Sequence, residues 1–104
     1  MIDIDYIMGL LDWNKSIADQ AEGIKMAENI ENINVFLQPC SKNYNKNVWD
    51  NCAKILSARS NEELSPYMIE LMEWLQDMNW PGAFCILERL RRIVRDPLFQ
   101  SAYT

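Results

Sequence analysis

Apolar positions recur along this chain at spacings of three and four residues, which is the period of an amphipathic α-helix. The pattern predicts about five main helices, at residues 3–12, 17–30, 46–58, 66–77 and 81–95. Only 3 Gly and 4 Pro occur, too few for the many turns of a β-sandwich or barrel. We therefore predict an all-α fold in which residues 1–104 form a single helical domain.

Local signals refine where two of these helices begin. Ser16 followed by Asp19 resembles an N-cap with an acid at the third helical position, and Ser60 with Glu63 has the spacing of a capping box. Ser65-Pro66 is a second start signal, five residues after Ser60. The fourth helix can begin at either signal, and we favour a short turn that precedes the main helix.

Three stretches between or after the helices have no long helical period. Residues 33–39 are apolar but short, and predict a buried turn of helix or an ordered loop. Residues 41–46 are polar and rich in Asn, which predicts an exposed loop. Asp96-Pro97 is expected to end the last helix and to start a short turn through Phe99.

One corner separates the last two predicted helices, in the run Trp74-Leu75-Gln76-Asp77-Met78-Asn79-Trp80-Pro81-Gly82. Asn79 is suited to end one helix in a left-handed conformation, and Pro81 to the first turn of the next. Residues 10–18 match residues 75–83 at Leu, Asp, Asn and Ala. The match favours stacked antiparallel helical hairpins of the HEAT or armadillo type.

The net charge is -5, which disfavours nonspecific binding to nucleic acid. Residues 1–31 hold seven acids against two lysines, and residues 61–79 hold five acids and no base. Residues 80–104 differ, because four arginines there outnumber two acids. An acidic chain of this kind is better suited to a basic protein partner than to nucleic acid.

The three cysteines, Cys40, Cys52 and Cys85, form no Cys-x-x-Cys pair, and the chain has no histidine. We expect Cys52 and Cys85 to be small core residues, and we assign no metal and no cofactor. A nucleophilic cysteine would need a base, so no catalytic residues are assigned and the chain is predicted not to be an enzyme. Free thiols, no signal peptide and no membrane-spanning apolar run predict a cytoplasmic protein without membrane contact.

The four tryptophans divide into two pairs by position. Trp49 and Trp74 lie on apolar helix faces and are predicted to be core residues. Trp13 and Trp80 lie at corners, where partial exposure is expected, although for Trp80 we favour packing as the apolar plug of a rigid turn.

A stripe of acids with helical spacing follows the fourth predicted helix: Glu70, Glu73 and Asp77. The simplest interpretation is a solvated face that pairs with arginines of the next helix, Arg89, Arg92 and Arg95. The functional interpretation is an acidic docking surface for a basic protein. A second group of acids offers an alternative docking surface: Asp12, Asp19 and Glu22.

The run from Trp74 to Pro81, preceded by Leu64 and Pro66-Tyr67, resembles the signature of domain of unknown function 5071, a bacterial family of small helical proteins. Three further segments are similar to the remaining sequence blocks of this family: Leu11-Asp12-Trp13-Asn14, Val35-Phe36-Leu37-Gln38-Pro39 and Asn47-Val48-Trp49-Asp50-Asn51-Cys52-Ala53. The resemblance therefore covers nearly the whole chain. The resemblance implies a HEAT-like fold without catalytic residues. It also implies a role as an immunity protein that guards a cell against toxins of bacterial competition systems.

The resulting hypothesis is an immunity protein that binds a toxin domain, with a nuclease as the leading case, and occludes its active site. An acidic helical surface would cover the basic cleft that holds nucleic acid, so the protein itself would not touch nucleic acid. The alternative is a non-enzymatic helical-repeat adaptor that binds another protein. A neighbouring gene that encodes a secreted toxin would separate the two hypotheses.

Overall fold

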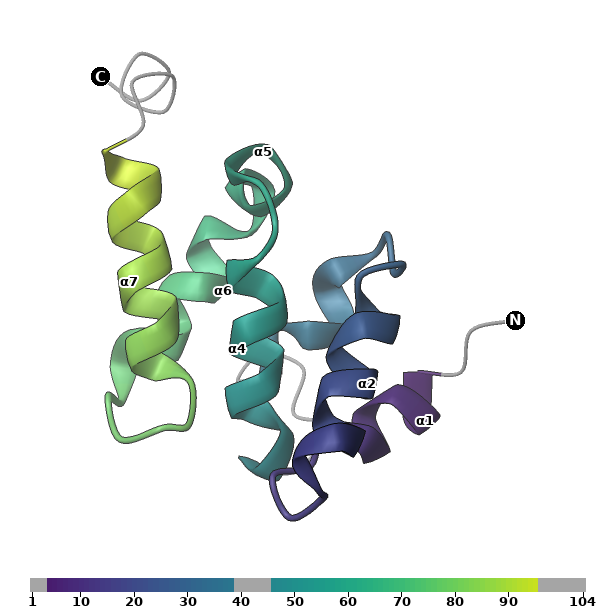
Figure 1. Cartoon of the computed structure of the whole chain (residues 1–104). Coiled ribbons are helices and arrows are strands. Elements are labelled where there is room, and N and C mark those ends of the chain that lie inside the picture. The colour runs from purple at the N-terminus through teal and green to yellow at the C-terminus, as the bar shows by residue number, and fades with distance from the viewer. Residues whose placement is uncertain (1–3, 39–45, 96–104) are drawn as a thin grey trace.

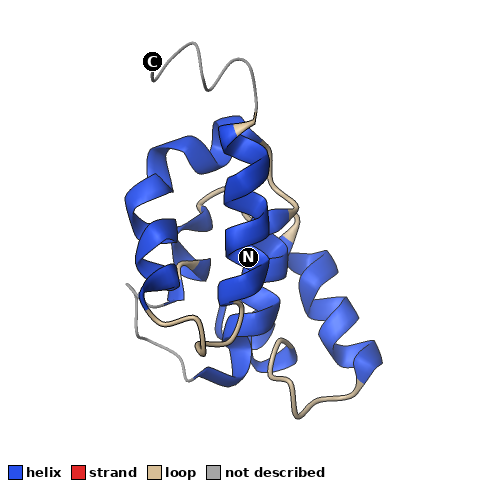
Figure 2. Cartoon of the chain, turned by 90° about the vertical axis from the view of Figure 1, so that its left-hand side faces the viewer, coloured by secondary structure: helices blue, strands red, loops and turns tan. Residues whose placement is uncertain are grey.

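Helices are the regular elements of residues 4–38 and 46–95, the ranges that the computed structural model describes (Figure 1 and Figure 2). The α-helices in these ranges are α1 (Ile4–Leu10), α2 (Ile17–Ala27), α4 (Trp49–Ser57), α5 (Asn61–Leu64), α6 (Met68–Glu73) and α7 (Ala83–Val94). The 3-10 helices are η1 (Ile33–Phe36), η2 (Lys46–Val48), η3 (Ser65–Tyr67) and η4 (Trp74–Gln76). No strand occurs in the described ranges, so the all-α prediction is confirmed, and every α-helix there except α5 exceeds one turn.

Several predicted helices are shortened because their last turns tighten. After α2, the N–H groups of residues 28, 29 and 30 donate to carbonyls only three residues back. The α-helix therefore ends at Ala27, and a tighter winding with hydrogen bonds between residues three apart continues to residue 30. The apolar stretch after it forms η1, whose Ile33 and Phe36 are buried, which selects the buried helical turn over the loop. Most of the predicted loop at 41–46, and the terminal turn through Phe99, lie outside the described residues.

Both predicted start signals form. The Ser16 hydroxyl accepts the Asp19 N–H at 3.1 Å and caps α2. Ser60 and Glu63 form a complete capping box, which begins α5, and η3 then begins at Ser65 with Pro66 as its second residue. The predicted short turn before the main helix is therefore confirmed, while the main helix itself is divided into α6 and η4 and ends at Gln76.

Three helices, α2, α4 and α7, lie side by side and run in the same direction, with α4 in the middle (Figure 1). Burial explains this central position, because most side chains of α4 are in the core: Trp49, Asn51, Cys52, Ala53, Ile55 and Leu56. α1 packs closely on α2 at Gly23, where a Cβ atom would lie 2.9 Å from the Leu10 Cβ. The predicted core positions of Trp49 and Trp74 are confirmed.

Two arginines join these three helices at the C-terminal ends of α2 and α4, where the last carbonyls lack helical partners. Arg59 donates through Nη2 to the carbonyls of Ala27 at 2.8 Å and Ile30 at 2.7 Å, at the end of α2. Arg89 donates through Nε to the Ser57 carbonyl at 3.0 Å and through Nη2 to the Arg59 carbonyl at 2.7 Å. A cation at the negative end of a helix dipole is favourable as well.

The bonds of Arg89 correct one prediction. Acidic partners from residues 70–77 were expected for Arg89 and Arg92, whereas both donate to main-chain oxygens at the end of α4. Arg89 is buried, and this desolvation is the main cause that lowers its pKa. Its hydrogen bonds to two carbonyls compensate the buried guanidinium group.

The two corners before α2 and α7 contain the same turn. The Asp12 carboxylate accepts the Asn14 N–H at 2.8 Å, and the Asp12 carbonyl accepts the Lys15 N–H at 2.9 Å. In the second corner the Asp77 carboxylate accepts the Asn79 N–H at 2.9 Å, and its carbonyl accepts the Trp80 N–H at 3.0 Å. The faint sequence repeat therefore encodes a repeated Asp-x-Asn turn.

A second turn follows directly in the corner before α7, and it corrects two predicted roles. The Ala83 N–H donates to the Trp80 carbonyl at 3.1 Å, and Gly82 has φ 86° and ψ -10°. Pro followed by Gly in this conformation is the signature of a type II turn. Pro81 thus precedes α7, which begins at Ala83, and Asn79 does not end the preceding helix, because η4 stops at Gln76 before an extended Asp77.

Candidate protein-binding surface

The acids predicted to bind a partner lie in two separate regions, one around α2 and one around α6. Asp19 and Glu22 are exposed and one turn apart on α2, and Asp12 lies in the corner before them. Glu70 and Glu73 are one turn apart on α6. The structure therefore brings together two pairs of acids, one on α2 and one on α6.

Asp77 does not continue the α6 stripe, which corrects the predicted set Glu70, Glu73 and Asp77. The helical period breaks after Gln76, and Asp77 has extended backbone angles. Its carboxylate also accepts a hydrogen bond from the Asn79 backbone, as that of Asp12 does from Asn14. Both aspartates thus stabilise a turn. The acidic stripe on α6 therefore consists of Glu70 and Glu73.

Two large apolar side chains are exposed beside this stripe. Ile69 is 73% exposed and Met72 57%, and the two are one turn apart on α6. Glu70 and Glu73 each follow one of them in the chain. We call these four residues the α6 face.

The exposed pair on α6 was not singled out from the sequence, although a signal was present. The buried positions of this region, Leu64, Leu71 and Trp74, follow a helical stripe. Ile69 and Met72 fall between those positions, so a helix that buries the stripe must expose them. Apolar residues out of phase with the core stripe were the informative feature.

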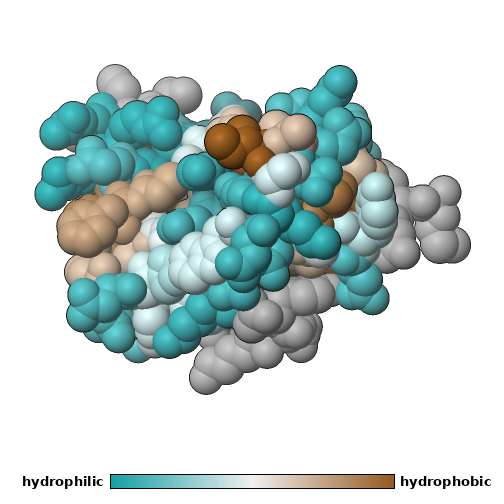
Figure 3. All heavy atoms as spheres, turned by 60° about the horizontal axis from the view of Figure 1, so that its bottom comes forward, coloured by the Kyte–Doolittle hydropathy of each residue, from teal (hydrophilic) through white to brown (hydrophobic). Residues whose placement is uncertain are grey.

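Other exposed apolar side chains lie near the starts of α2 and α7. Ile17 is 87% exposed at the first position of α2, Trp13 is 44% exposed in the corner before it, and Phe84 is exposed in the first turn of α7. On the face in Figure 3, apolar groups form separate patches between hydrophilic ones. The predicted partial exposure of Trp13 is confirmed, and Trp80 packs edge-on against Trp49 at a centroid distance of 5.7 Å, as favoured.

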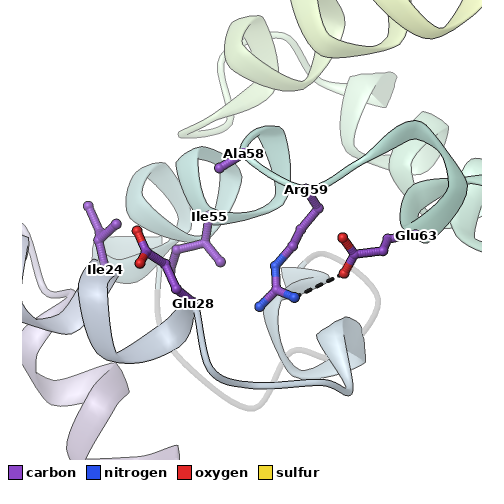
Figure 4. Close-up of a pocket in the computed structure, with 6 residues that line it drawn as sticks. All are labelled: Ile24, Glu28, Ile55, Ala58, Arg59 and Glu63. Atoms are coloured by element: carbon purple, nitrogen blue, oxygen red, sulfur yellow. Dashed lines mark hydrogen bonds and ion pairs between the residues drawn. The ribbon is translucent and has the colours of Figure 1, made fainter.

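A groove of about 270 Å³ lies between the C-terminal halves of α2 and α4 (Figure 4). Its lining is Ile24, Glu28, Ile55, Ala58, Arg59 and Glu63. An Arg59 Nη1 atom lies 3.0 Å from a Glu63 carboxylate oxygen. This hydrogen bond is the main cause that lowers the pKa of Glu63, and the Ser60 N–H adds to it. We call this cavity the α2–α4 groove.

The described cysteines behave as structural residues. Cys52 is fully buried, as predicted, and burial raises its pKa to about 12. Cys85 is only half-buried, with its Sγ 3.1 Å from the Ser57 Oγ, while Cys40 lies outside the described residues. Within residues 4–38 and 46–95, no three His, Cys, Asp or Glu side chains are grouped to hold a metal ion, and no helix has the length and apolar character to cross a membrane.

The buried thiol predicts a loss of stability in alkaline solution. An unfolded cysteine ionises near 9.0 and Cys52 in the folded state near 12, so its contribution to stability is complete below pH 9 and is lost as the pH rises toward 12. Between about pH 8 and about pH 10.5, wild type should lose about 1–2 kcal/mol more unfolding free energy than the Cys52→Ala variant. Urea unfolding at both pH values measures this, and equal losses in the two proteins would contradict it.

Comparison with known proteins identifies one related family. A family model described as Domain of unknown function (DUF5071) matches residues 45–98, just over half of the 104 residues. The match includes α4, the α6 face, the corner before α7, and α7 itself, whereas α1 and α2 precede it. No curated protein and no solved structure matches the chain.

Proposed function

We propose that this chain, which belongs to the DUF5071 family, is an immunity protein that binds a bacterial competition toxin and covers its active site. In this proposal the protein works in the cytoplasm, catalyses no reaction and needs no cofactor. Its partner is a basic toxin domain, with a nuclease as the leading case. It blocks the toxin by occlusion and does not contact nucleic acid itself.

The observation that carries the proposal is the pair of exposed apolar side chains in the most one-sidedly acidic part of the chain. Ile69 and Met72 project from α6, within a segment, residues 61–79, that holds five acids and no base. Protein interfaces commonly combine apolar anchors with a polar rim. Methionine adds adaptable packing because its side chain is unbranched and polarizable. The α6 face has both parts, two apolar side chains and two acidic ones, and is large enough for a small contact area.

The excess of acids in residues 61–79, the segment that contains the α6 face, favours a basic partner. A nuclease cleft must attract phosphate groups, and it does so with positive charge. An acidic surface is drawn to such a cleft, which speeds association and excludes acidic proteins. The net charge of -5 acts in the same direction at long range. Both the affinity and the association rate of the complex should therefore fall as salt is added.

We also propose that the helices form a short HEAT-like stack, which would present the α6 face on a rigid support. The parallel course of α2, α4 and α7 supports this arrangement (Figure 1). So do the matching Asp-x-Asn turns that precede α2 and α7. In a stack of hairpins each unit covers the apolar face of its neighbour.

Growth of cells that express the toxin tests the immunity function. A candidate toxin domain, taken from a gene next to this one, is produced in a sensitive strain, with and without this chain. We expect growth to stop with the toxin alone and to recover when the chain is co-expressed, because the occluded toxin cannot reach its substrate. A chain that copurifies with the neighbouring gene product but restores no growth would contradict the proposal and favour the adaptor function.

A further inference from the structure

The α2–α4 groove carries one negative charge, on Glu28, that the described residues do not neutralise. Arg59 donates hydrogen bonds to Glu63 and to two main-chain carbonyls, so its positive charge is already paired with these groups. The carboxylate of Glu28 has no hydrogen-bond or ion-pair partner within the described part of the chain. One arginine against two glutamates leaves an excess of one negative charge in the lining.

The rest of the groove is apolar and small. Ile24 and Ile55 lie beside the Glu28 carboxylate, and the Arg59–Glu63 pair lies beyond them (Figure 4). Ile55 is buried and Ile24 half-buried, so both present packed hydrocarbon to the groove. A volume of about 270 Å³ is below the roughly 300–1,000 Å³ typical of small-molecule sites, and it suits one side chain.

We propose that the α2–α4 groove receives a single arginine side chain from a basic protein partner. The guanidinium group donates two hydrogen bonds to the Glu28 carboxylate, a geometry that a planar fork provides and an ammonium group does not. The methylene groups of the arginine lie on Ile24 and Ile55, as the stems of long basic side chains do on apolar surfaces. The negative charge of Glu28 favours a cationic group, and the apolar surface of Ile24 and Ile55 favours the methylene groups that carry it.

This inference goes beyond the proposed function, because it names the side chain that the partner supplies at a second surface. The groove lies between α2 and α4, whereas the proposed toxin contact lies on α6. The inference requires a protein partner with an exposed arginine, but it does not depend on the identity of the toxin. It can therefore be tested without the toxin.

A titration followed by NMR tests the inference on the full chain. The probe is arginine with acetyl and methylamide blocking groups, and the matched neutral probe is the citrulline compound, which has nearly the same shape. We expect saturable shifts of the Ile24 and Ile55 methyl signals with the arginine probe only. In Glu28→Gln the dissociation constant should rise about tenfold or more, since a charge-assisted hydrogen bond is lost. Glu88→Gln, an exposed change on α7 and outside the groove, is the control and should bind like wild type.

Several outcomes would overturn the inference. These are no saturable shift, equal shifts with citrulline, or an unchanged dissociation constant in Glu28→Gln. A dimer that forms in wild type and is lost in Glu28→Gln would assign the groove to a second copy of the chain and would overturn it too. Growth rescue by the chain is measured separately, so a failure of either experiment leaves the other result intact.

Discussion

Replacing Trp74 by alanine should cost about 3–5 kcal/mol of unfolding free energy, a large part of the stability of a domain this small. The ring is 0% exposed and packs edge-on against Trp49 at a centroid distance of 6.2 Å. Its Nε1 also donates to the Pro81 carbonyl at 2.8 Å, which ties the start of η4 to the corner before α7. The substitution therefore creates a cavity and releases that corner at the same time.

Urea unfolding followed by circular dichroism measures this loss of unfolding free energy. Two further variants are measured for comparison. Trp74→Phe keeps much of the ring but removes the donor to Pro81, so its loss should be intermediate. Trp13→Ala removes a ring that is already partly exposed and should cost clearly less. If Trp74→Ala costs no more than Trp13→Ala, the central role of Trp74 in the core is wrong.

Replacing Gly82 by alanine should destabilise the protein by about 2–5 kcal/mol, since two penalties add. The backbone at Gly82 has φ 86°, a left-handed conformation that is unfavourable for any residue with a Cβ atom. The new Cβ would also lie 2.7 Å from the Ala53 Cβ and 3.0 Å from the Trp49 carbonyl oxygen. Both neighbours belong to the central helix α4, which has little freedom to move away.

A second glycine provides the matched control for this substitution. Gly9 is exposed within α1, and a Cβ atom there would meet nothing within 4 Å. Gly9→Ala should raise stability by up to about 1 kcal/mol, because alanine favours the helix. The two glycine variants are thus expected to shift the melting temperature in opposite directions. A neutral Gly82→Ala would show that the corner adapts more easily than the type II turn suggests.

Features that depend on a few neighbouring residues could be predicted from the sequence. The caps at Ser16 and Ser60 formed as expected, because the donor and acceptor lie within three residues of each other. The corner before α7 was harder, since Asp77, Asn79 and the Pro81-Gly82 pair each offer a turn signal. The outcome depended on the Asp77 carboxylate and on the positive φ of Gly82, so the helix ends moved away from Asn79 and Pro81.

Features that join distant parts of the chain could not be predicted in this way. Arg59 and Arg89 cap helices whose carbonyls lie about 30 residues earlier in the sequence, and no local pattern pairs them. The α2–α4 groove likewise combines residues from 24 to 63. The α6 face is different, because the exposed positions of Ile69 and Met72 follow from the phase of the core stripe.

The most direct test of the proposed α6 face measures toxin affinity and unfolding free energy on one double variant, Ile69→Ser with Met72→Ser. Because both side chains are exposed, stability should stay within about 0.5 kcal/mol of wild type. The dissociation constant for the purified toxin domain should rise about 10–100-fold, the loss expected for apolar anchors of an interface. Ile17→Ser, a change at a still more exposed position on α2, should alter neither quantity. An unchanged dissociation constant in the double variant, or an equal loss in Ile17→Ser, would contradict the assignment of toxin binding to α6.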